Sequence, residues 1–295
     1  MDTQGCTAHC PILSGCDTLW SHIRRRFDRG NLLQRRQDHI SAAQCGAMSQ
    51  LHHPGDYGMT KRFSAVFFDA ANTLLHPDPP VGELYARTAR KYGVDVVGTD
   101  VQAQFRRSWE ALQGKAVGDP VRYGIGEADG RRWWHALVAE TFRPLGLPQP
   151  FDVFFDELYN LFADPDVWRV YPEVFEVLEA LKTRGLIMGV LSNWDIRLGP
   201  LLEGLKLMAY FDHLVLSAVV GWEKPHRRIF ESALELVGFP ADEVLHVGDN
   251  YQQDVVGAQQ VGMYAVWLRR RGTQTADCPV ISSLGDLVTI IDGTN

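Results

Sequence analysis

Short, continuous apolar runs punctuate the chain from residue 61 onward. Five of them are long enough for buried strands: 64–68, 186–191, 213–217, 243–247 and 264–268. Because polar residues do not alternate within them, these runs predict strands that are buried on both faces of a parallel sheet. Apolar positions at helical spacing separate several of the runs, at 171–185 and 226–238. Strand and helix in alternation predict the fold class α/β, with a doubly wound parallel sheet.

The segment 171–185 carries signals for both ends of its helix. Pro172 suits the first helical turn, where a missing amide hydrogen costs no internal hydrogen bond. Gly185 suits the position just past the end, which often takes a left-handed backbone. His226 is expected to cap the helix at 226–238.

The interval between the first strand and residue 171 breaks this rhythm. It holds no convincing strand, but amphipathic helical patterns at 82–93, 100–114, 129–146 and 150–164. Ligands of open α/β sheets bind at the carboxyl edge of the strands. Helices inserted after the first strand therefore predict a cap over an active site. We predict a core of residues 61–78 and 166–295 and a helical cap of residues 79–165.

Residues 1–60 differ from the rest, because they lack sustained apolar periodicity and hold four of the five cysteines. We predict a disordered extension, with Met59 as the functional start. A transit peptide for organellar import is one alternative, although several aspartates in the segment speak against it. The other alternative is a metal site whose spacing matches no tight C-x2-C pair. Its ligands would be Cys6, His9, Cys10 and Cys16.

Composition and charge narrow the class of protein. The chain has 295 residues, enough for one sizeable core or for a core with a second, smaller domain. A net charge of -7 argues against a general nucleic-acid binder, which needs a basic face for phosphates. No apolar run reaches the roughly 18 residues of a membrane span. The scarcity of cysteine after residue 60 favours a reduced, cytoplasmic protein, expected as a monomer or homodimer.

Polar side chains gather at the carboxyl ends of the predicted strands. In chain order they are Asp69, Thr73, Ser192, Asn193, Lys224, Asp249 and Asp254. A single aspartate at a strand end is commonly a turn or cap residue. Carboxylates, hydroxyls and a lysine that converge on one edge of a sheet are much harder to explain as caps.

Phosphoryl transfer accounts for each of these residue types. A carboxylate can attack phosphorus only if the negative charge of the phosphate is screened, which a divalent cation can do. Asp69 and Asp249 are expected to ligate Mg²⁺, and Asp254 to bind it directly or through water. Lys224 would neutralise the remaining charge, while Ser192 and its neighbours would donate to phosphate oxygens. Attack by Asp69 would then split hydrolysis into two steps, through an aspartyl-phosphate.

Residues 63 to about 290 resemble the haloacid dehalogenase-like (HAD) hydrolases with a helical cap inserted after the first strand. The resemblance rests on "FFDAANTLL", "VLSNWD", "EKPHRRIF" and "HVGDNYQQDVVGA", which match the motifs of that family in order. Within the superfamily, these stretches and "RRWWHALV" look most like the HAD-domain-containing protein 3 and rhythmically-expressed-gene-2 group. The resemblance implies Asp69 as nucleophile, Lys224 as a catalytic group, and Ser192, Asn193 and Thr73 around the phosphate. It also implies the backbone carbonyl of Ala71 as a metal ligand.

Ala71 departs from the pattern of HAD phosphatases, in which a second aspartate stands two residues after the nucleophile. That aspartate protonates the leaving group and then activates water, and losing a positioned acid or base typically costs about 10²–10⁴-fold in rate. Three outcomes stay open: a weak phosphatase or one limited to good leaving groups, a 2-haloacid dehalogenase, and a non-catalytic binding protein. The two acids of "GDNYQQD" make sense mainly around a cation, which favours a Mg²⁺-dependent phosphatase of a small phosphorylated metabolite.

Several other side chains have simpler explanations. Aromatic residues at helical spacing are expected mainly in the core of the cap: Trp133, Trp134, Phe154 and Phe155. The arginine pairs at 106–107 and 131–132 are expected on a solvated face, and so is the run at 269–271.

Overall fold

The computed structural model describes residues 63–115 and 127–293. The predictions for residues 1–60, including the cysteine and histidine site and the start at Met59, lie outside the described residues. The described part contains a parallel sheet of six strands in the order β5-β4-β1-β6-β7-β8. Its strands are β1 (Ala65–Phe68), β4 (Ile187–Ser192), β5 (His213–Leu216), β6 (Val244–Gly248), β7 (Tyr264–Leu268) and β8 (Val280–Ile281). The predicted fold class is confirmed.

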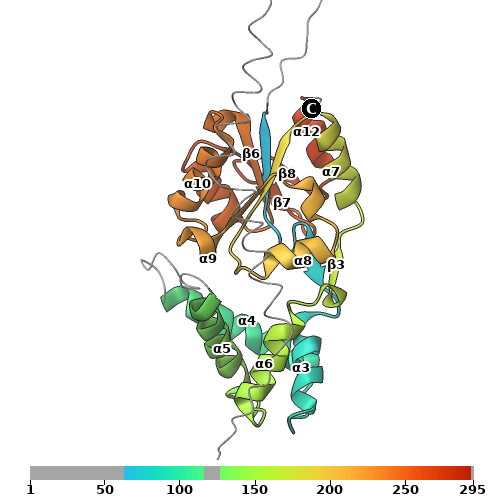
Figure 1. Cartoon of the computed structure of the whole chain (residues 1–295), viewed down its shortest axis with the longest axis vertical. Helices are drawn as coiled ribbons and strands as arrows, with labels where there is room; N and C mark the ends of the chain where they lie inside the picture. The colour runs from blue at the N-terminus through green and yellow to red at the C-terminus, as the bar shows by residue number, and fades with distance from the viewer. Residues whose placement is uncertain (1–62, 116–126, 294–295) are drawn as a thin grey trace, which may run out of the picture. The chain divides into compact units, whose positions relative to one another are not determined.

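Helices cover both faces of this sheet (Figure 1). One face packs against α7 (Val174–Thr183), α8 (Leu198–Gly204) and α12 (Asp286–Asp292). The other face packs against α10 (Arg227–Val237) and α11 (Gly257–Gln259). Burial on both sides explains why β1, β4 and β6 form from continuous apolar runs, since almost none of their side chains meets water.

The ends of two helices test the cap signals in the sequence. Helix α7 begins at Val174, so Pro172 lies in the preceding turn and not in the first helical turn. Gly185 has φ of 67° just past the end of that helix, a backbone conformation that side chains beyond glycine rarely adopt. Nδ1 of His226 accepts a hydrogen bond from the amide of Arg228 at 3.2 Å, which confirms His226 as the cap of α10.

The interval after β1 contains two strands that the apolar pattern missed. β2 (Leu75–Pro77) and β3 (Trp168–Val170) form a separate antiparallel pair. The expectation of no strand in this interval is therefore wrong. Both strands are three residues long, too short to show a periodicity.

Among the described residues, four α-helices lie in the chain between β2 and β3. They are α3 (Val81–Arg90), α4 (Gly98–Lys115), α5 (Glu127–Phe142) and α6 (Phe151–Leu161). Their apolar residues form a cluster of their own, which includes the buried Phe142 and Phe154. Phe155 is buried with them, while Trp133 and Trp134 are half-buried. The domain boundaries at 79 and 165 stay a prediction.

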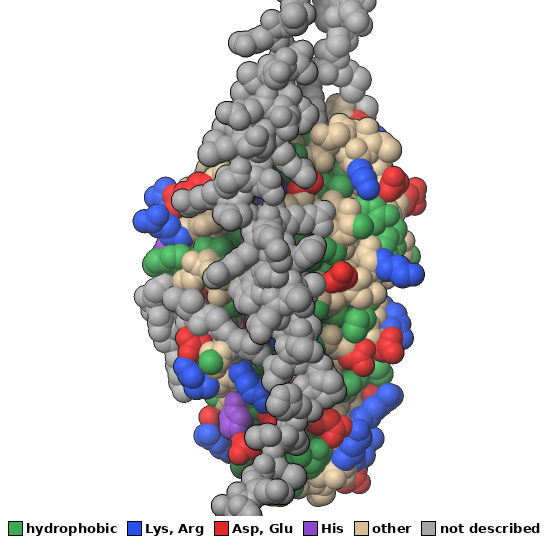
Figure 2. All heavy atoms as spheres, viewed as in Figure 1, with side chains coloured by type: hydrophobic (Ala, Val, Ile, Leu, Met, Phe, Trp, Pro, Cys, Tyr) green, Lys and Arg blue, Asp and Glu red, His purple; other side chains and the backbone are tan. Residues whose placement is uncertain are grey.

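The surface of the described residues carries charge of both signs. On the face shown in Figure 2, Lys and Arg side chains lie interspersed with Asp and Glu. In the described ranges, no helix is both long enough and apolar enough to cross a bilayer.

Candidate active site

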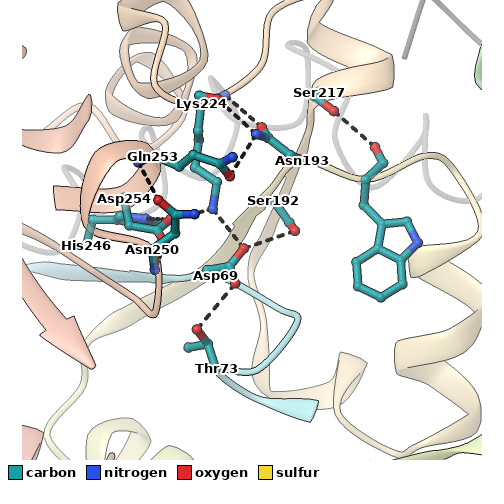
Figure 3. A network of polar contacts seen from close by, with 11 residues as sticks. Asp69, Thr73, Ser192, Asn193, Ser217, Lys224, His246, Asn250, Gln253 and Asp254 are labelled. Carbon is teal, nitrogen blue, oxygen red and sulfur yellow. Dashed lines mark hydrogen bonds and ion pairs between the residues drawn. The ribbon is translucent and has the colours of Figure 1, made fainter. Parts of the chain in front are cut away.

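The topology brings the polar strand ends together. β4, β1 and β6 are neighbours in the parallel sheet, so their carboxyl ends meet at one edge. Asp69 directly follows β1, Ser192 is the last residue of β4, and Asp249 directly follows β6. The predicted meeting of these residues at one edge is observed, and Figure 3 shows Ser192 and Asp69 pointing toward each other.

Asp69 is held by side chains from three segments (Figure 3). Its Oδ1 accepts hydrogen bonds from Nζ of Lys224 at 2.7 Å and from Oγ of Ser192 at 3.2 Å. Its Oδ2 accepts one from Oγ1 of Thr73 at 3.3 Å. Burial raises the pKa of Asp69 above its ordinary value, although the charge of Lys224 opposes this effect. The lysine therefore favours the ionised carboxylate that a nucleophile requires.

Lys224 is a buried cation between two carboxylates. Its side chain is 1% exposed, and its Nζ also donates to Oδ1 of Asp254 at 2.5 Å. Burial by itself would lower the pKa of Lys224, but the charges of Asp254 and Asp69 outweigh it and raise the pKa above its ordinary value. The ammonium group therefore stays protonated and supplies a fixed positive charge beside Asp69.

Asn193 holds the backbone of Lys224 in place. Its Oδ1 accepts from the amide of Lys224 at 2.7 Å, and its Nδ2 donates to the carbonyl of Lys224 at 2.9 Å. The same Nδ2 lies 3.4 Å from Oε1 of Gln253. These contacts give the Asn193 side chain a positioning task, and its predicted role as a phosphate ligand stays a prediction.

Asp254 is fixed on both of its oxygens. Oδ1 contacts Nζ of Lys224 and Nε2 of His246, the latter at 3.0 Å, while Oδ2 accepts from the amide of Asn250 at 2.9 Å. Burial opposes ionisation, but Lys224 and His246 hold the pKa of Asp254 well below its ordinary value. Gly248 makes room for it, because a Cβ there would lie 2.2 Å from Cγ of Asp254.

Three carboxylates form a cluster that suits a cation. Ligand oxygens of Asp69, Asp249 and Asp254 lie within 4.8 Å of one another. Burial, and then the charges of the other two acids, raise the pKa of Asp249 to about 7. Three acids against the single ammonium of Lys224 leave an excess of negative charge that a divalent cation would balance.

The donor set fits Mg²⁺, which prefers a few carboxylates together with several waters. Asp69 and Asp249 would hold it, whereas the Asp254 side chain is only 2% exposed, against 10% for Asp69. Asp254 therefore suits the orientation of Lys224 better than direct ligation. The backbone carbonyl of Ala71 as a further ligand stays a prediction.

Arg197 ties the segment after β4 to helix α6. Its Nη2 and Nε donate to the two oxygens of Asp195 at 2.6 and 2.9 Å, and its Nη1 donates to the carbonyl of Tyr159 at 2.8 Å. The guanidinium lies 3.6 Å from the centre of the Tyr159 ring. Asp195 is 2% exposed, so this is a buried ion pair.

Sequence reasoning missed His246 and Asn250, and it placed Arg270 on a solvated face. His246 is wholly buried in an apolar strand, and a lone histidine in such a run was its only signal. Asn250 lies inside the fourth motif but supplies a backbone amide, which no side-chain pattern reveals. The arginine pairs of α4 and α5 are partly or fully exposed, as expected for a solvated face. The prediction of a solvated face for the run 269–271 is wrong for Arg270, because its side chain is only 18% exposed.

Comparison with known proteins places this fold and site in one class. The family model for haloacid dehalogenase-like hydrolases matches residues 63–262. The chain belongs to this family, which makes it a hydrolase by class.

Two relatives and one solved structure illustrate the match. The chain is 36% identical over 201 residues to haloacid dehalogenase-like hydrolase domain-containing protein 3 of Bos taurus, covering 67% of this chain and 78% of that protein. It is 27% identical over 223 residues to the rhythmically expressed gene 2 protein of Drosophila melanogaster, covering 71% and 84% respectively. A HAD phosphatase structure from Thermococcus onnurineus superposes with a TM-score of 0.54 at 25% identity, covering 78% and 98%. The predicted resemblance to this group is confirmed.

Proposed function

We propose that this hydrolase is a Mg²⁺-dependent phosphatase of a small phosphorylated metabolite. One observation carries the proposal: the Asp69 carboxylate is held by Lys224 and lies within an acidic cluster suited to a cation. Bound Mg²⁺ would screen the charge of the phosphate so that a carboxylate can approach it. The cytoplasmic location, the monomeric or dimeric state and the absence of nucleic-acid partners remain proposals.

The first step would be attack by an oxygen of Asp69 on phosphorus. A bond forms between that oxygen and phosphorus, and the bond from phosphorus to the leaving oxygen breaks with its electron pair. Thr73 and Ser192 hold the carboxylate in position, and the charge of Lys224 stabilises the negative charge that builds up. The product is an aspartyl-phosphate, which water then hydrolyses to free phosphate and the original carboxylate.

Ala71 limits the rate of both steps. Its methyl group can neither protonate the leaving oxygen nor take a proton from water, so solvent has to serve in both steps. We therefore propose a weak phosphatase that favours leaving groups stable as anions. Replacing Ala71 by aspartate should raise turnover on a poor leaving group by up to about 10²-fold, at the low end of what a positioned acid supplies.

A screen of phosphate esters with and without Mg²⁺ tests the proposal. Wild type should hydrolyse some esters in the presence of Mg²⁺, Asp69→Asn should hydrolyse none, and Ala71→Asp should exceed wild type. Chelation of the metal should abolish turnover in every active variant. Hydrolysis of 2-haloacids without metal would point to a dehalogenase, and silence from all three proteins would point to a binding protein.

A further inference from the structure

The guanidinium of Arg270 lies against the turn that follows the nucleophile. Its Nη2 donates to the carbonyl of Thr73 at 2.8 Å, and its Nε donates to the carbonyl of Asn72 at 3.1 Å. Two successive carbonyls of the first motif are thus held by one side chain that follows β7, two strands away from β1 in the sheet. In this turn Asn72 has φ of 58°, a left-handed backbone conformation that asparagine adopts more readily than most residues other than glycine.

The remaining contacts hold the guanidinium itself in place. Its Nη1 pairs with Oε1 of Glu173 at 2.6 Å, and the group lies 3.4 Å from the centre of the Tyr171 ring. Tyr171 in turn packs against His76 of β2, with ring centres 4.7 Å apart. Arg270 therefore joins the turn to the segment through which the chain returns from the cap helices.

The turn held by Arg270 carries two groups that contact the acidic cluster. The hydroxyl of Thr73 donates to Asp69, and the side chain of Asn72 is near enough to Asp249 to oppose the rise of its pKa. A shift of this turn would therefore move both contacts together. Misplacement of reacting groups by about 1 Å can cost about 10²-fold in rate.

From these contacts we propose that Arg270 is a positioning residue, which sets the geometry of Asp69 and Asp249 through the backbone of residues 72–73. The inference rests on the proposed function for its kinetic consequence. The three nitrogens of the planar guanidinium each reach a different acceptor, two carbonyls and a carboxylate, whereas the three donors of lysine sit on one atom, so lysine should replace Arg270 poorly. Arg270 itself touches neither the nucleophile nor the metal ligands in the contacts described above.

Arg184 offers a matched control. It pairs with both oxygens of Asp292 at 2.8 and 2.7 Å and donates to the carbonyl of Ala180 at 2.8 Å. It is thus a second arginine clamp that binds a carboxylate and a backbone carbonyl, but it joins α7 to α12 and contacts none of the motif residues.

The test compares Arg270→Ala, Arg270→Lys and Arg184→Ala with wild type by steady-state kinetics on p-nitrophenyl phosphate with Mg²⁺. Arg270→Ala should lower kcat by about 30- to 100-fold with KM changed by less than about threefold, because positioning acts on the reacting groups. Arg270→Lys should recover only a small part of that loss. Arg184→Ala should keep kcat within about twofold of wild type, even if its melting temperature falls as far as that of Arg270→Ala.

Hydrogen exchange provides a readout that does not depend on catalysis. Three amides close the turn: Asn72 donates to the carbonyl of Leu75, and both Leu74 and Leu75 donate to that of Ala70. A peptide covering residues 69–75 should exchange faster in Arg270→Ala and at the wild-type rate in Arg184→Ala. Unchanged exchange in folded Arg270→Ala overturns the inference, and so does a kcat within about twofold of an active wild type. A wild type without turnover refutes the proposed function instead, and the exchange result then decides the inference by itself.

Discussion

Replacing Lys224 by methionine should strongly destabilise the fold, because Lys224 is the one cation among the described residues that bonds to both Asp69 and Asp254. Nζ lies 2.7 Å from Oδ1 of Asp69 and 2.5 Å from Oδ1 of Asp254, and the lysine side chain is 1% exposed. Methionine fills a similar volume, so little of the effect would come from a cavity.

The magnitude follows from the charges that are left behind. Breaking a buried ion pair by removal of one partner costs about 3–5 kcal/mol, since the remaining charge loses its compensation. Here two carboxylates lose the same partner, so the free energy of unfolding should fall by at least about 3–5 kcal/mol. Adding Asp254→Asn to Lys224→Met removes one of the two buried charges and should restore about 1–2 kcal/mol or more.

Urea unfolding with a chelator present measures these differences without a cation that could stand in for the lysine. Lys182→Met is the control, because that lysine is exposed on α7 and should change the free energy of unfolding by less than about 0.5 kcal/mol. A loss below about 1 kcal/mol for Lys224→Met would contradict the reasoning, since it would mean that the two carboxylates need no cation. Failure of Asp254→Asn to restore stability in that background would contradict it equally.

Two further substitutions test the geometry of the site. Gly248→Ala should lower kcat by about 10²-fold, because the added Cβ must displace the carboxylate of Asp254. Gly285→Ala is the control and should leave kcat unchanged, because its Cβ would meet its nearest atom at 3.6 Å. Steady-state kinetics of both variants check this difference. Arg197→Met should cost about 3 kcal/mol in urea unfolding, because it leaves a buried carboxylate unpaired. Arg87→Met removes an exposed ion pair with Glu83 on α3 and should lower the free energy of unfolding by less than about 1 kcal/mol.

The strands of the central sheet were predictable because burial on both faces leaves a plain signal. β7 matches its apolar run, and β1, β4, β5 and β6 match within one residue at each end. β8 was missed because it has two residues, and β3 was missed because Trp168–Val170 includes an exposed arginine. The order of the strands could not be derived from the apolar pattern, since pairing joins segments far apart in the chain.

The site was predictable where side chains follow a strand directly. Asp69, Ser192 and Lys224 meet as expected because parallel strands end at a common edge. Contacts to backbone amides and carbonyls could not be predicted in this way, because they follow from no pattern of side chains. Arg270 stands in a run of three arginines that looks like a solvated turn, yet its partner Thr73 lies 197 residues earlier. The task of Asn193 was missed for the same reason, because its partner groups are the amide and the carbonyl of Lys224.

The proposed mechanism requires that Asp69 becomes phosphorylated during turnover. Because Ala71 leaves the second step without a positioned base, the aspartyl-phosphate should accumulate with a substrate that has a good leaving group. Mixing the protein with p-nitrophenyl phosphate and Mg²⁺, quenching in acid and mapping the peptides by mass spectrometry should find one added phosphoryl group on Asp69. Metal-dependent turnover that leaves Asp69 unmodified, or that persists in Asp69→Asn, would contradict the account.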